Sequence, residues 1–423
     1  MQILSRSDFP TDRKAFLKDF ISGITVAIVA LPLAIGFGIT SGMSAAAGIS
    51  TAIIAGFIAG LLGGSRFQVS GPTGAMTVVL IPVIHNYGIV AIPTLGFMAG
   101  VIVLLMALFK LGDLIKKVPI SVVEGFTVGI ALVISLQQIP YALGVSKGQG
   151  ERTLEVAVNT VQDALNFGLK WQTILVVVIT LLIKFNIVRI VESFKIKMYF
   201  PASFSALFLT TLLVNAFDMD VSFIGEIPRN VSTFTSPLLD SGDYVNLILP
   251  AFSIAILVAI ESLLSARVAD DISNTPVNNQ FRPNQELFGQ GAATAVASIF
   301  GGMPATGAIA RTNVNVRSGA ITRVSAMVHS IFLLLIVVFL APIFAHIPSA
   351  AIAGVLIGTS FRIFNKASML EIFRSSKSNI FIYIITALVT VSIDLIWGIA
   401  VGIALYLIAN QFKRAIAAKG FRK

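Results

Sequence analysis

The chain has 423 residues, of which 56% are hydrophobic and only 12% are charged, and its formal net charge is +10. A typical soluble domain has about 25% charged residues, so this composition excludes a soluble enzyme, a disordered hub and a secreted disulfide scaffold. The sequence contains no cysteine, which excludes disulfide and thiolate chemistry. The composition therefore favours a protein that crosses a membrane many times.

Apolar runs, punctuated by Gly and Pro, follow one another along the whole chain. A membrane-spanning helix needs about 20 apolar residues. We predict an all-α membrane protein with fourteen transmembrane segments, at 21–39, 44–63, 73–87, 90–110, 120–143, 172–190, 199–217, 245–268, 286–300, 306–318, 323–346, 349–363, 378–393 and 394–412. The runs at 73–87, 286–300 and 306–318 are too short or too polar to cross a bilayer alone.

The positive charge is confined to the two termini and to short connections, among which we count Lys110, Lys184 and Arg374. This distribution indicates cytoplasmic loops and termini, because Lys and Arg are retained on that side of a membrane. It does not indicate a nucleic-acid partner. We expect a multi-pass protein of the inner (plasma) membrane with both termini in the cytoplasm.

An acidic stretch divides the chain into two halves. Residues 218–244 contain five acidic residues against the single base Arg229. We predict one transmembrane domain over residues 1–423, with a first repeat at about 15–217, an extracellular linker at about 218–244 and a second repeat at about 245–412.

A short pattern occurs once in each half. A glycine pair, a proline and then Thr-Gly-Ala appear as Gly63-Gly64 with 72–75, and again as Gly301-Gly302 with 304–308. Gly and Pro interrupt helices, and such breaks are tolerated at membrane depth only where the backbone lines a cavity or is buried in protein. Each copy therefore predicts an extended segment that leads into a half-helix, with Thr73 and Thr306 as N-caps.

The two predicted half-helices point to an anion site. The start of a helix offers unpaired N–H groups and the positive end of the dipole, and paired broken segments in two halves are typical of a transporter site at the midplane. Close packing of small residues is the alternative. Arg311 lies about one turn beyond Thr306 and would add a guanidinium group, which binds oxyanions.

Glu261 lies deep in the apolar run that begins at Leu247. A charge at the centre of a span costs at least about 2.5–3.5 kcal/mol, which makes this residue a candidate for function. Ser265 follows one turn later on the same helix face. Three roles stay open for the carboxyl group: it can carry a proton, hold a small cation, or form an ion pair with an arginine.

Taken together, these motifs resemble the sulfate permease (SulP) family, also called solute carrier family 26. The matching stretches are 31–34 with Phe37-Gly38, 68–74, 261–266, 284–291 and 304–312. The resemblance covers nearly the whole chain. It implies fourteen spans in two inverted seven-span repeats, divided into core and gate domains, with elevator-like alternating access.

The resemblance also implies where substrate binds, namely between the starts of the third and tenth spans. The candidate substrate-binding residues are Phe37, Thr73, Gly74, Ala75, Thr306, Ala308, Ile309, Ala310 and Arg311. In the eighth span the coupling carboxylate of the family falls on Glu261, with Ser265 as its neighbour. Two departures stand out: Leu33 occupies a position where many sulfate-transporting relatives have Gln, and we expect no STAS domain after the last span.

We therefore expect a secondary active anion transporter, namely a proton-coupled symporter of sulfate or a similar oxyanion. Sodium-coupled bicarbonate transport and proton-coupled dicarboxylate transport stay open, and an anion channel is the alternative of a different class. The expected partners are a small inorganic anion and membrane lipid, and a homodimer stays open. We expect no cofactor besides the coupling ion, H⁺ or Na⁺, and no metal. The sequence has no nucleophile–base pair or nucleotide loop, so we expect no enzyme.

Overall fold

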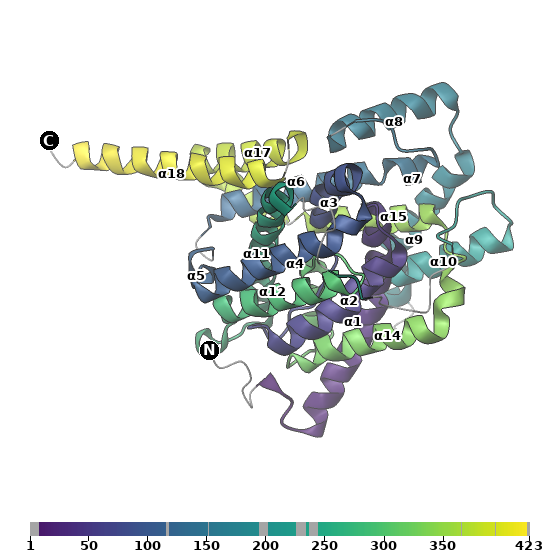
Figure 1. The fold of residues 1–423 in the computed structure, drawn as a ribbon, viewed down its shortest axis with the longest axis horizontal. Coiled ribbons are helices and arrows are strands. Elements are labelled where there is room, and N and C mark those ends of the chain that lie inside the picture. Colours follow the sequence, from purple (N-terminus) through teal and green to yellow (C-terminus); the bar gives the residue numbers. More distant parts are fainter. Residues whose placement is uncertain are drawn as a thin grey trace. The chain divides into compact units, whose positions relative to one another are not determined.

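The computed structural model describes residues 8–115, 118–150, 152–193, 202–225, 234–236, 244–364, 366–393 and 395–420. Within these residues the chain is almost entirely helical, and Figure 1 shows the course of the helices. In chain order they are α1 (Arg13–Thr40), α2 (Ala45–Leu62), α3 (Gly74–Tyr87), η2 (Ile89–Ala91), α4 (Ile92–Leu108), α5 (Gly112–Ile115), α6 (Ile120–Gln137), α7 (Ile139–Leu143), α8 (Thr153–Phe167), α9 (Trp171–Ser193), α10 (Ala202–Ala216), α11 (Tyr244–Ser273), η3 (Val277–Asn279), α12 (Pro283–Ile299), α13 (Ile309–Arg317), α14 (Val324–Phe344), α15 (Ser349–Ile363), α16 (Lys366–Arg374), α17 (Lys377–Ser392) and α18 (Leu395–Gly420). The strands of the described residues are β1 (Ser70–Gly71) and β2 (Thr306–Gly307).

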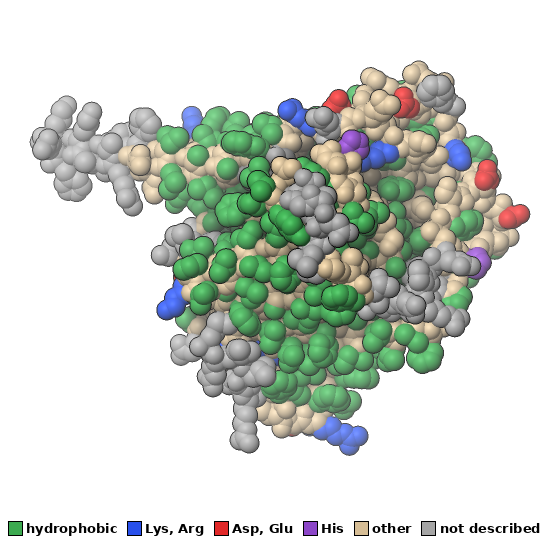
Figure 2. All heavy atoms as spheres, viewed as in Figure 1, with side chains coloured by type: hydrophobic (Ala, Val, Ile, Leu, Met, Phe, Trp, Pro, Cys, Tyr) green, Lys and Arg blue, Asp and Glu red, His purple; other side chains and the backbone are tan. Residues whose placement is uncertain are grey.

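The predicted all-helical membrane fold is confirmed, and each of the predicted segments coincides with a helix. Six helical stretches of the described residues are long and apolar enough to cross a bilayer, and others, such as α3, are shorter. Figure 2 shows hydrophobic side chains over most of one face and few charged ones, as expected of a surface that faces lipid. The fourteen crossings and the inversion of the repeats stay predictions.

Several helix boundaries differ from the predicted ones because caps, and not hydropathy, set them. Helix α1 begins at Arg13, well before the apolar run, because the side chain of Asp12 accepts a hydrogen bond from the Ala15 N–H group at 2.7 Å. Helix α12 likewise begins early, with Pro283 in its first turn. The sequence reading missed α5, α8 and α16, since none of them is a continuous apolar run.

The described residues belong to two compact units, and each unit takes segments from both halves of the chain. The first comprises Met1–Lys116, Tyr141–Gly144 and Lys170–Leu356, and the second comprises Lys117–Pro140, Val145–Leu169 and Ile357–Lys423. The predicted linker at 218–244 therefore does not separate them. Residues 226–233 and 237–243 of that linker lie outside the described residues.

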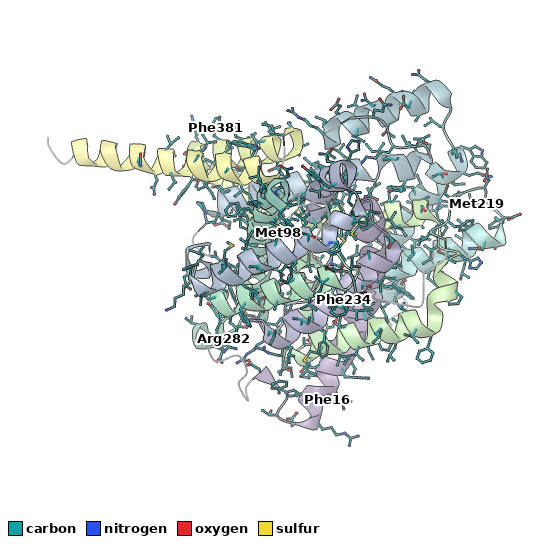
Figure 3. The ribbon with its side chains drawn as sticks, in the orientation of Figure 1. Phe16, Met98, Met219, Phe234, Arg282 and Phe381 are labelled. Carbon is teal, nitrogen blue, oxygen red and sulfur yellow. The ribbon has the colours of Figure 1, made fainter. Side chains whose placement is uncertain are left out.

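In the first unit, small side chains let helix backbones approach closely. Helix α12 packs against both α4 and α2, and α1 packs against α14 and α2 (Figure 1). A buried cluster of alanines joins α2 and α12 to the segment before β2: Ala55, Ala59, Ala293, Ala297 and Ala305. Figure 3 shows the side chains around this bundle, including Phe16 on α1 and Arg282 just before α12. Packing of this kind replaces the hydrophobic effect as the force between helices in lipid.

In the second unit, α6 and α17 run parallel with glycines of α6 against threonines of α17. A Cβ atom at Gly125 would lie 3.0 Å from the Thr386 Cβ atom, and one at Gly129 would lie 2.5 Å from the Thr390 Cβ atom. Helix α18 packs on the same pair, and α8 and α16 contact both α6 and α17. Close glycine–threonine contacts thus join the two central helices of the second unit.

The structure corrects the expectation that Lys184 lies in a cytoplasmic loop. Lys184 is inside α9, its side chain is 0% exposed, and its Nζ atom donates to the carbonyl oxygen of Val355 in α15 at 2.5 Å. A buried ammonium group needs such acceptors, because an unpaired charge inside a membrane protein is expensive. The charge pattern alone gives no sign of this long-range partner.

The contact of α4 with α12 makes a testable prediction about Gly100. A Cβ atom there would lie 2.6 Å from the backbone nitrogen of Ala295 and 2.7 Å from the carbonyl oxygen of Gly291. Because backbone atoms cannot move aside, we expect Gly100→Val to lower the free energy of unfolding by about 1–3 kcal/mol, the cost of overpacking. Thermal unfolding in detergent measures this loss. Val101→Leu, at an exposed neighbour on α4, is the control, and an equal loss in both variants would contradict the prediction.

Candidate functional site

Two short strands bring the two broken segments together. Strand β1 pairs antiparallel with β2, with Ser70 opposite Gly307 and Gly71 opposite Thr306. The ladder continues by a hydrogen bond from the Ala308 N–H group to the carbonyl oxygen of Val69 at 3.0 Å. Because the strands are antiparallel, the chain leaves one end of the pair into α3 and the other end into α13. The predicted pattern of an extended segment that leads into a short helix is confirmed in both copies.

Glycines near the two strands serve this geometry. Gly301, of the second glycine pair, lies just after α12 and has a φ of 77°, a conformation that favours glycine. At Gly71 any side chain would collide with the guanidinium group of Arg311. Gly301 thus lies where the chain turns, and Gly71, directly before the first copy of Pro-Thr-Gly-Ala, lies where a side chain approaches the backbone.

Both half-helices begin without a side-chain cap. Helix α3 starts at Gly74 after Thr73, and α13 starts at Ile309 after Ala308, and neither preceding residue caps the helix with its side chain. The first N–H groups of a helix have no partner within it, so both starts keep backbone donors. Thr73 occupies the predicted N-cap position of α3 but does not cap the helix with its hydroxyl group, whereas the N-cap residue of α13 is Ala308 and not the predicted Thr306. Other residues bind both hydroxyl groups.

The Thr73 hydroxyl donates to Glu261 instead. The distance from its Oγ1 atom to the Glu261 Oε2 atom is 3.1 Å. Glu261 comes from the middle of α11, so this bond joins the start of α3 to the candidate coupling residue. The sequence put these two residues in the same site, and the structure brings them into contact.

The Thr306 hydroxyl lies 2.9 Å from the hydroxyl of Ser262, the residue after Glu261. The Ser262 Oγ atom also accepts a hydrogen bond from the Gly307 N–H group at 3.0 Å. Both Ser262 and Thr306 are fully buried. Helix α11 therefore contacts the start of α3 through Glu261 and strand β2 through Ser262.

Ser265, the predicted neighbour of Glu261, joins α11 to a third element, helix α13. Its hydroxyl donates to the Thr312 Oγ1 atom at 3.1 Å, and that same atom accepts from the Val69 N–H group at 3.1 Å. One threonine thus joins α11, α13 and the segment before β1. Ser265 thus connects α11 to α13 through Thr312.

Arg311 lies in the first turn of α13 and is 1% exposed. Its guanidinium group donates to the carbonyl oxygens of Ser70, at 3.5 Å, and of Pro72. The Nε atom has no hydrogen-bond partner among the described residues. Arg311 and Glu261 interact electrostatically. However, no Glu261–Arg311 contact within 4.0 Å occurs in the described part of the chain.

The remaining candidates differ in exposure. Thr73, Glu261, Ile309 and Ala310 are half-buried. Gly74, Ala75 and Ala308 are buried. Phe37 is also buried, on α1, which packs against both α3 and α13. The assignment of these residues to substrate stays a prediction.

A pair of side chains on α12 holds β1 in place. The Glu286 Oε2 atom accepts hydrogen bonds from the N–H groups of Gly64 and Ser65, both at 2.8 Å. The Gln290 Nε2 atom, one turn later, donates to Glu286 at 2.8 Å and to the Ser70 hydroxyl at 2.6 Å. The chain is thereby fixed from the end of α2 to the first residue of β1.

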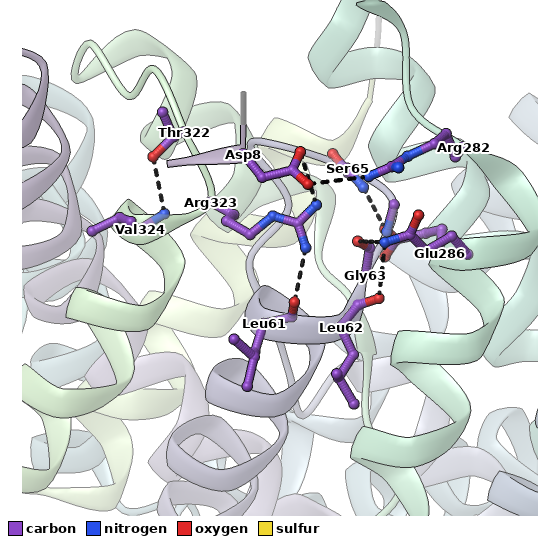
Figure 4. A network of polar contacts seen from close by, with 12 residues as sticks. Asp8, Leu61, Leu62, Gly63, Ser65, Arg282, Glu286, Thr322, Arg323 and Val324 are labelled. Carbon is purple, nitrogen blue, oxygen red and sulfur yellow. Dashed lines mark hydrogen bonds and ion pairs between the residues drawn. The ribbon is translucent and has the colours of Figure 1, made fainter. Parts of the chain in front are cut away.

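The network ends in a set of ion pairs near the start of the described chain (Figure 4). Asp8 pairs with Arg323 at 3.2 Å and with Arg282 at 3.4 Å, and the Arg323 NH1 atom donates to the carbonyl oxygen of Leu61 at 2.8 Å. These residues fasten the N-terminal segment and the end of α2 to the starts of α12 and α14.

Sequence reasoning missed Ser262, Thr312, Glu286 and Gln290. Thr312, Glu286 and Gln290 lie inside stretches that carry the family resemblance, but nothing in the local pattern assigns them a partner. The signal that would have identified Ser262 is a second polar residue directly after Glu261 in an apolar run.

Comparison with known proteins shows what the whole chain is similar to. The sequence model of the Sulfate permease family matches residues 16–386. The Bacillus subtilis protein named "Putative sulfate transporter YvdB" is 38% identical over 92% of this chain and 72% of its own length. The bicarbonate transporter BicA of Synechocystis is 31% identical over 91% of this chain and 68% of its own length. The solved transmembrane domain of a cyanobacterial BicA has a TM-score of 0.80 and 29% identity, and the match covers 92% of this chain and 98% of that domain.

The contact between α11 and β2 predicts the effect of removing one hydroxyl. Ser262→Ala would leave the buried Gly307 N–H group without its acceptor, which costs about 1–3 kcal/mol. Thermal unfolding of the purified protein should show this loss. Ser253→Ala is the matched control, since that buried hydroxyl of α11 only donates to the Leu249 carbonyl of its own helix. Equal stability of the two variants would show that the Ser262 contact contributes nothing.

Proposed function

The chain belongs to the sulfate permease family, and we propose that it is a secondary active transporter that moves sulfate or a similar small oxyanion together with protons. The family and its relatives are transporters and not enzymes. The observation that carries the proposal is the pair of uncapped helix starts, of α3 and α13, beside Glu261. We further propose that the protein lies in the plasma membrane with both termini in the cytoplasm.

Backbone donors at the two helix starts are the groups that bind the anion in this proposal. Each start carries the positive end of a helix dipole, which stabilises a negative ligand. The half-buried Thr73, Ile309 and Ala310 give a small anion access to these donors. Arg311 adds a full positive charge directly behind them, and its bonds to the carbonyls of Ser70 and Pro72 hold that charge in place.

Glu261 couples the anion to a proton. An ionised carboxylate next to the anion repels it, and a protonated carboxyl group does not. Binding of the proton and binding of the anion therefore favour each other. The Thr73 hydroxyl, which lies between the carboxyl group and the start of α3, is the link between the two events.

The first unit holds β1, β2, α3, α11 and α13. We propose that this unit carries the occupied site as one body, as elevator-like alternating access requires. The hydrogen bonds of Ser262 and Thr312 support the proposal, since they tie the parts of the site to one another.

Bicarbonate transport with sodium is the second candidate. Its support is the similarity to BicA proteins and the donor set at Glu261, since a carboxylate and a hydroxyl oxygen are ligands of a hard cation. Uptake of labelled sulfate and of labelled bicarbonate into proteoliposomes, with proton and sodium gradients varied separately, distinguishes the two. A rate of sulfate uptake that is unchanged by an inward proton gradient would contradict the first proposal.

The coupling role predicts a specific defect in Glu261→Gln. The amide is always neutral, so we expect loss of sulfate uptake driven by a proton gradient, with sulfate–sulfate exchange retained. Asp271→Asn, an exposed acid later in α11, is the control and should behave as the parent protein. Concentrative uptake that survives in Glu261→Gln would show that the proton binds elsewhere.

The anion role predicts that Arg311→Lys weakens sulfate binding. Lysine keeps the charge but lacks the planar fork that reaches two carbonyls. We expect the half-saturating sulfate concentration to rise about 10- to 100-fold, as for a lost charge-assisted hydrogen bond of about 1.5–3 kcal/mol. Arg317→Lys, at an exposed site in the last turn of α13, is the control. An unchanged half-saturating concentration in Arg311→Lys would remove Arg311 from the site.

A further inference from the structure

Helix α8 of the second unit has three distinct faces. One face is buried against its own unit: Val156, Ala157, Thr160 and Ala164. A second face is apolar but exposed: Leu154, Val158, Val161 and Leu165. A third face is polar: Glu155, Asn159, Gln162 and Asp163. At 100° per residue the exposed apolar side chains form one continuous stripe, separate from the buried face.

Helix α16 has the same three faces. Ile372 is buried in a cluster with Tyr383 of α17 and Val128 of α6. Leu370 and Phe373 are 56% and 48% exposed, on a side that differs from the buried one. The polar face is formed by Glu371 and Arg374, which are both exposed.

The two helices occupy corresponding places in the two halves of the chain. Helix α8 lies between α6 and α9, and α16 lies between α15 and α17. Both pack on α6 and α17. The Glu124 carboxyl group is hydrogen-bonded to Ser368, which puts α16 beside the first turns of α6, whereas α8 is joined to the C-terminal end of α6 through α7. The pair α6–α17 therefore has one amphipathic helix attached at each end.

The charges around the two apolar stripes differ. At α8 the exposed acids Glu155 and Asp163 are balanced by the exposed bases Arg152, directly before the helix, and Lys170, shortly after it. At α16, Arg374 and the following Lys377 outnumber Glu371. Basic residues beside an apolar stripe are typical of a helix that lies on an anionic lipid surface.

We propose that α8 and α16 lie along the two opposite surfaces of the bilayer, each with its apolar stripe among the lipid chains, and that α16 docks on anionic headgroups. A protein partner would need two separate sites to cover both stripes, whereas a bilayer has two surfaces by nature. The two helices then fix the depth of the second unit in the membrane. This surface is independent of the anion site.

The absence of cysteine from the chain makes single-cysteine spin labelling direct. Leu165→Cys and Phe373→Cys report on the apolar stripes, and Gln162→Cys and Glu371→Cys are matched controls on the polar faces. In vesicles we expect the stripe labels to be more accessible to oxygen than to a water-soluble nickel complex, and the control labels to show the reverse. Stripe labels accessible chiefly to nickel would overturn the proposal, and labels shielded from both reagents would indicate a second copy or another protein in its place.

The anionic preference has its own test. The label at Phe373→Cys should lie deeper in vesicles that contain phosphatidylglycerol than in pure phosphatidylcholine, and Arg374→Gln with Lys377→Gln should abolish the difference. The label at Leu165→Cys should have the same depth in both lipids. Equal depth of the Phe373→Cys label in the two lipids would overturn the docking of α16 on anionic headgroups.

Discussion

Two short strands of extended backbone, β1 and β2, lie buried inside a bundle of apolar helices, where their N–H and C=O groups cannot form hydrogen bonds with water. An unsatisfied backbone group costs several kcal/mol in such surroundings. The strands therefore bond to each other, Ser262 accepts from the Gly307 N–H group, and Arg311 donates to the carbonyls that precede α3. The need to satisfy one broken stretch of backbone explains why polar side chains gather at this point of an otherwise apolar unit.

The same requirement leaves the two helix starts open. In a soluble helix a hydroxyl group in the position of Thr73 would bond to the backbone of its own helix. Here Glu261 takes that hydroxyl, while Ser262 takes the hydroxyl of Thr306. The backbone donors at the starts of α3 and α13 therefore stay uncapped. Glu261 of α11 is hydrogen-bonded to Thr73, the residue directly before α3. The same few contacts thus satisfy the hydrogen-bonding groups of the strands and leave the N–H groups at the two helix starts without side-chain caps.

The sequence was informative where the physics is local. Breaks caused by Gly and Pro, and a carboxyl group in an apolar run, can be recognised without knowing what surrounds them, and they predicted both broken segments and Glu261. Roles set by distant partners could not be predicted. Gln290 bonds to Ser70 across 220 positions of the chain, and Lys184 reaches a carbonyl 171 positions away. Thr73 lies at its predicted N-cap position, but its hydroxyl group, like that of Thr306, bonds to a residue distant in the chain and not to its own helix.

The proposed binding of the anion by main-chain amides has an evolutionary consequence. Almost any residue other than proline at the positions after Thr73 and Ala308 supplies the same N–H group, so drift in these codons leaves the electropositive ends of α3 and α13 intact. Substitution of the surrounding side chains can then change which anion binds, while the backbone N–H groups continue to attract negative charge. A scaffold of this kind lends itself to diversification among ions of one sign.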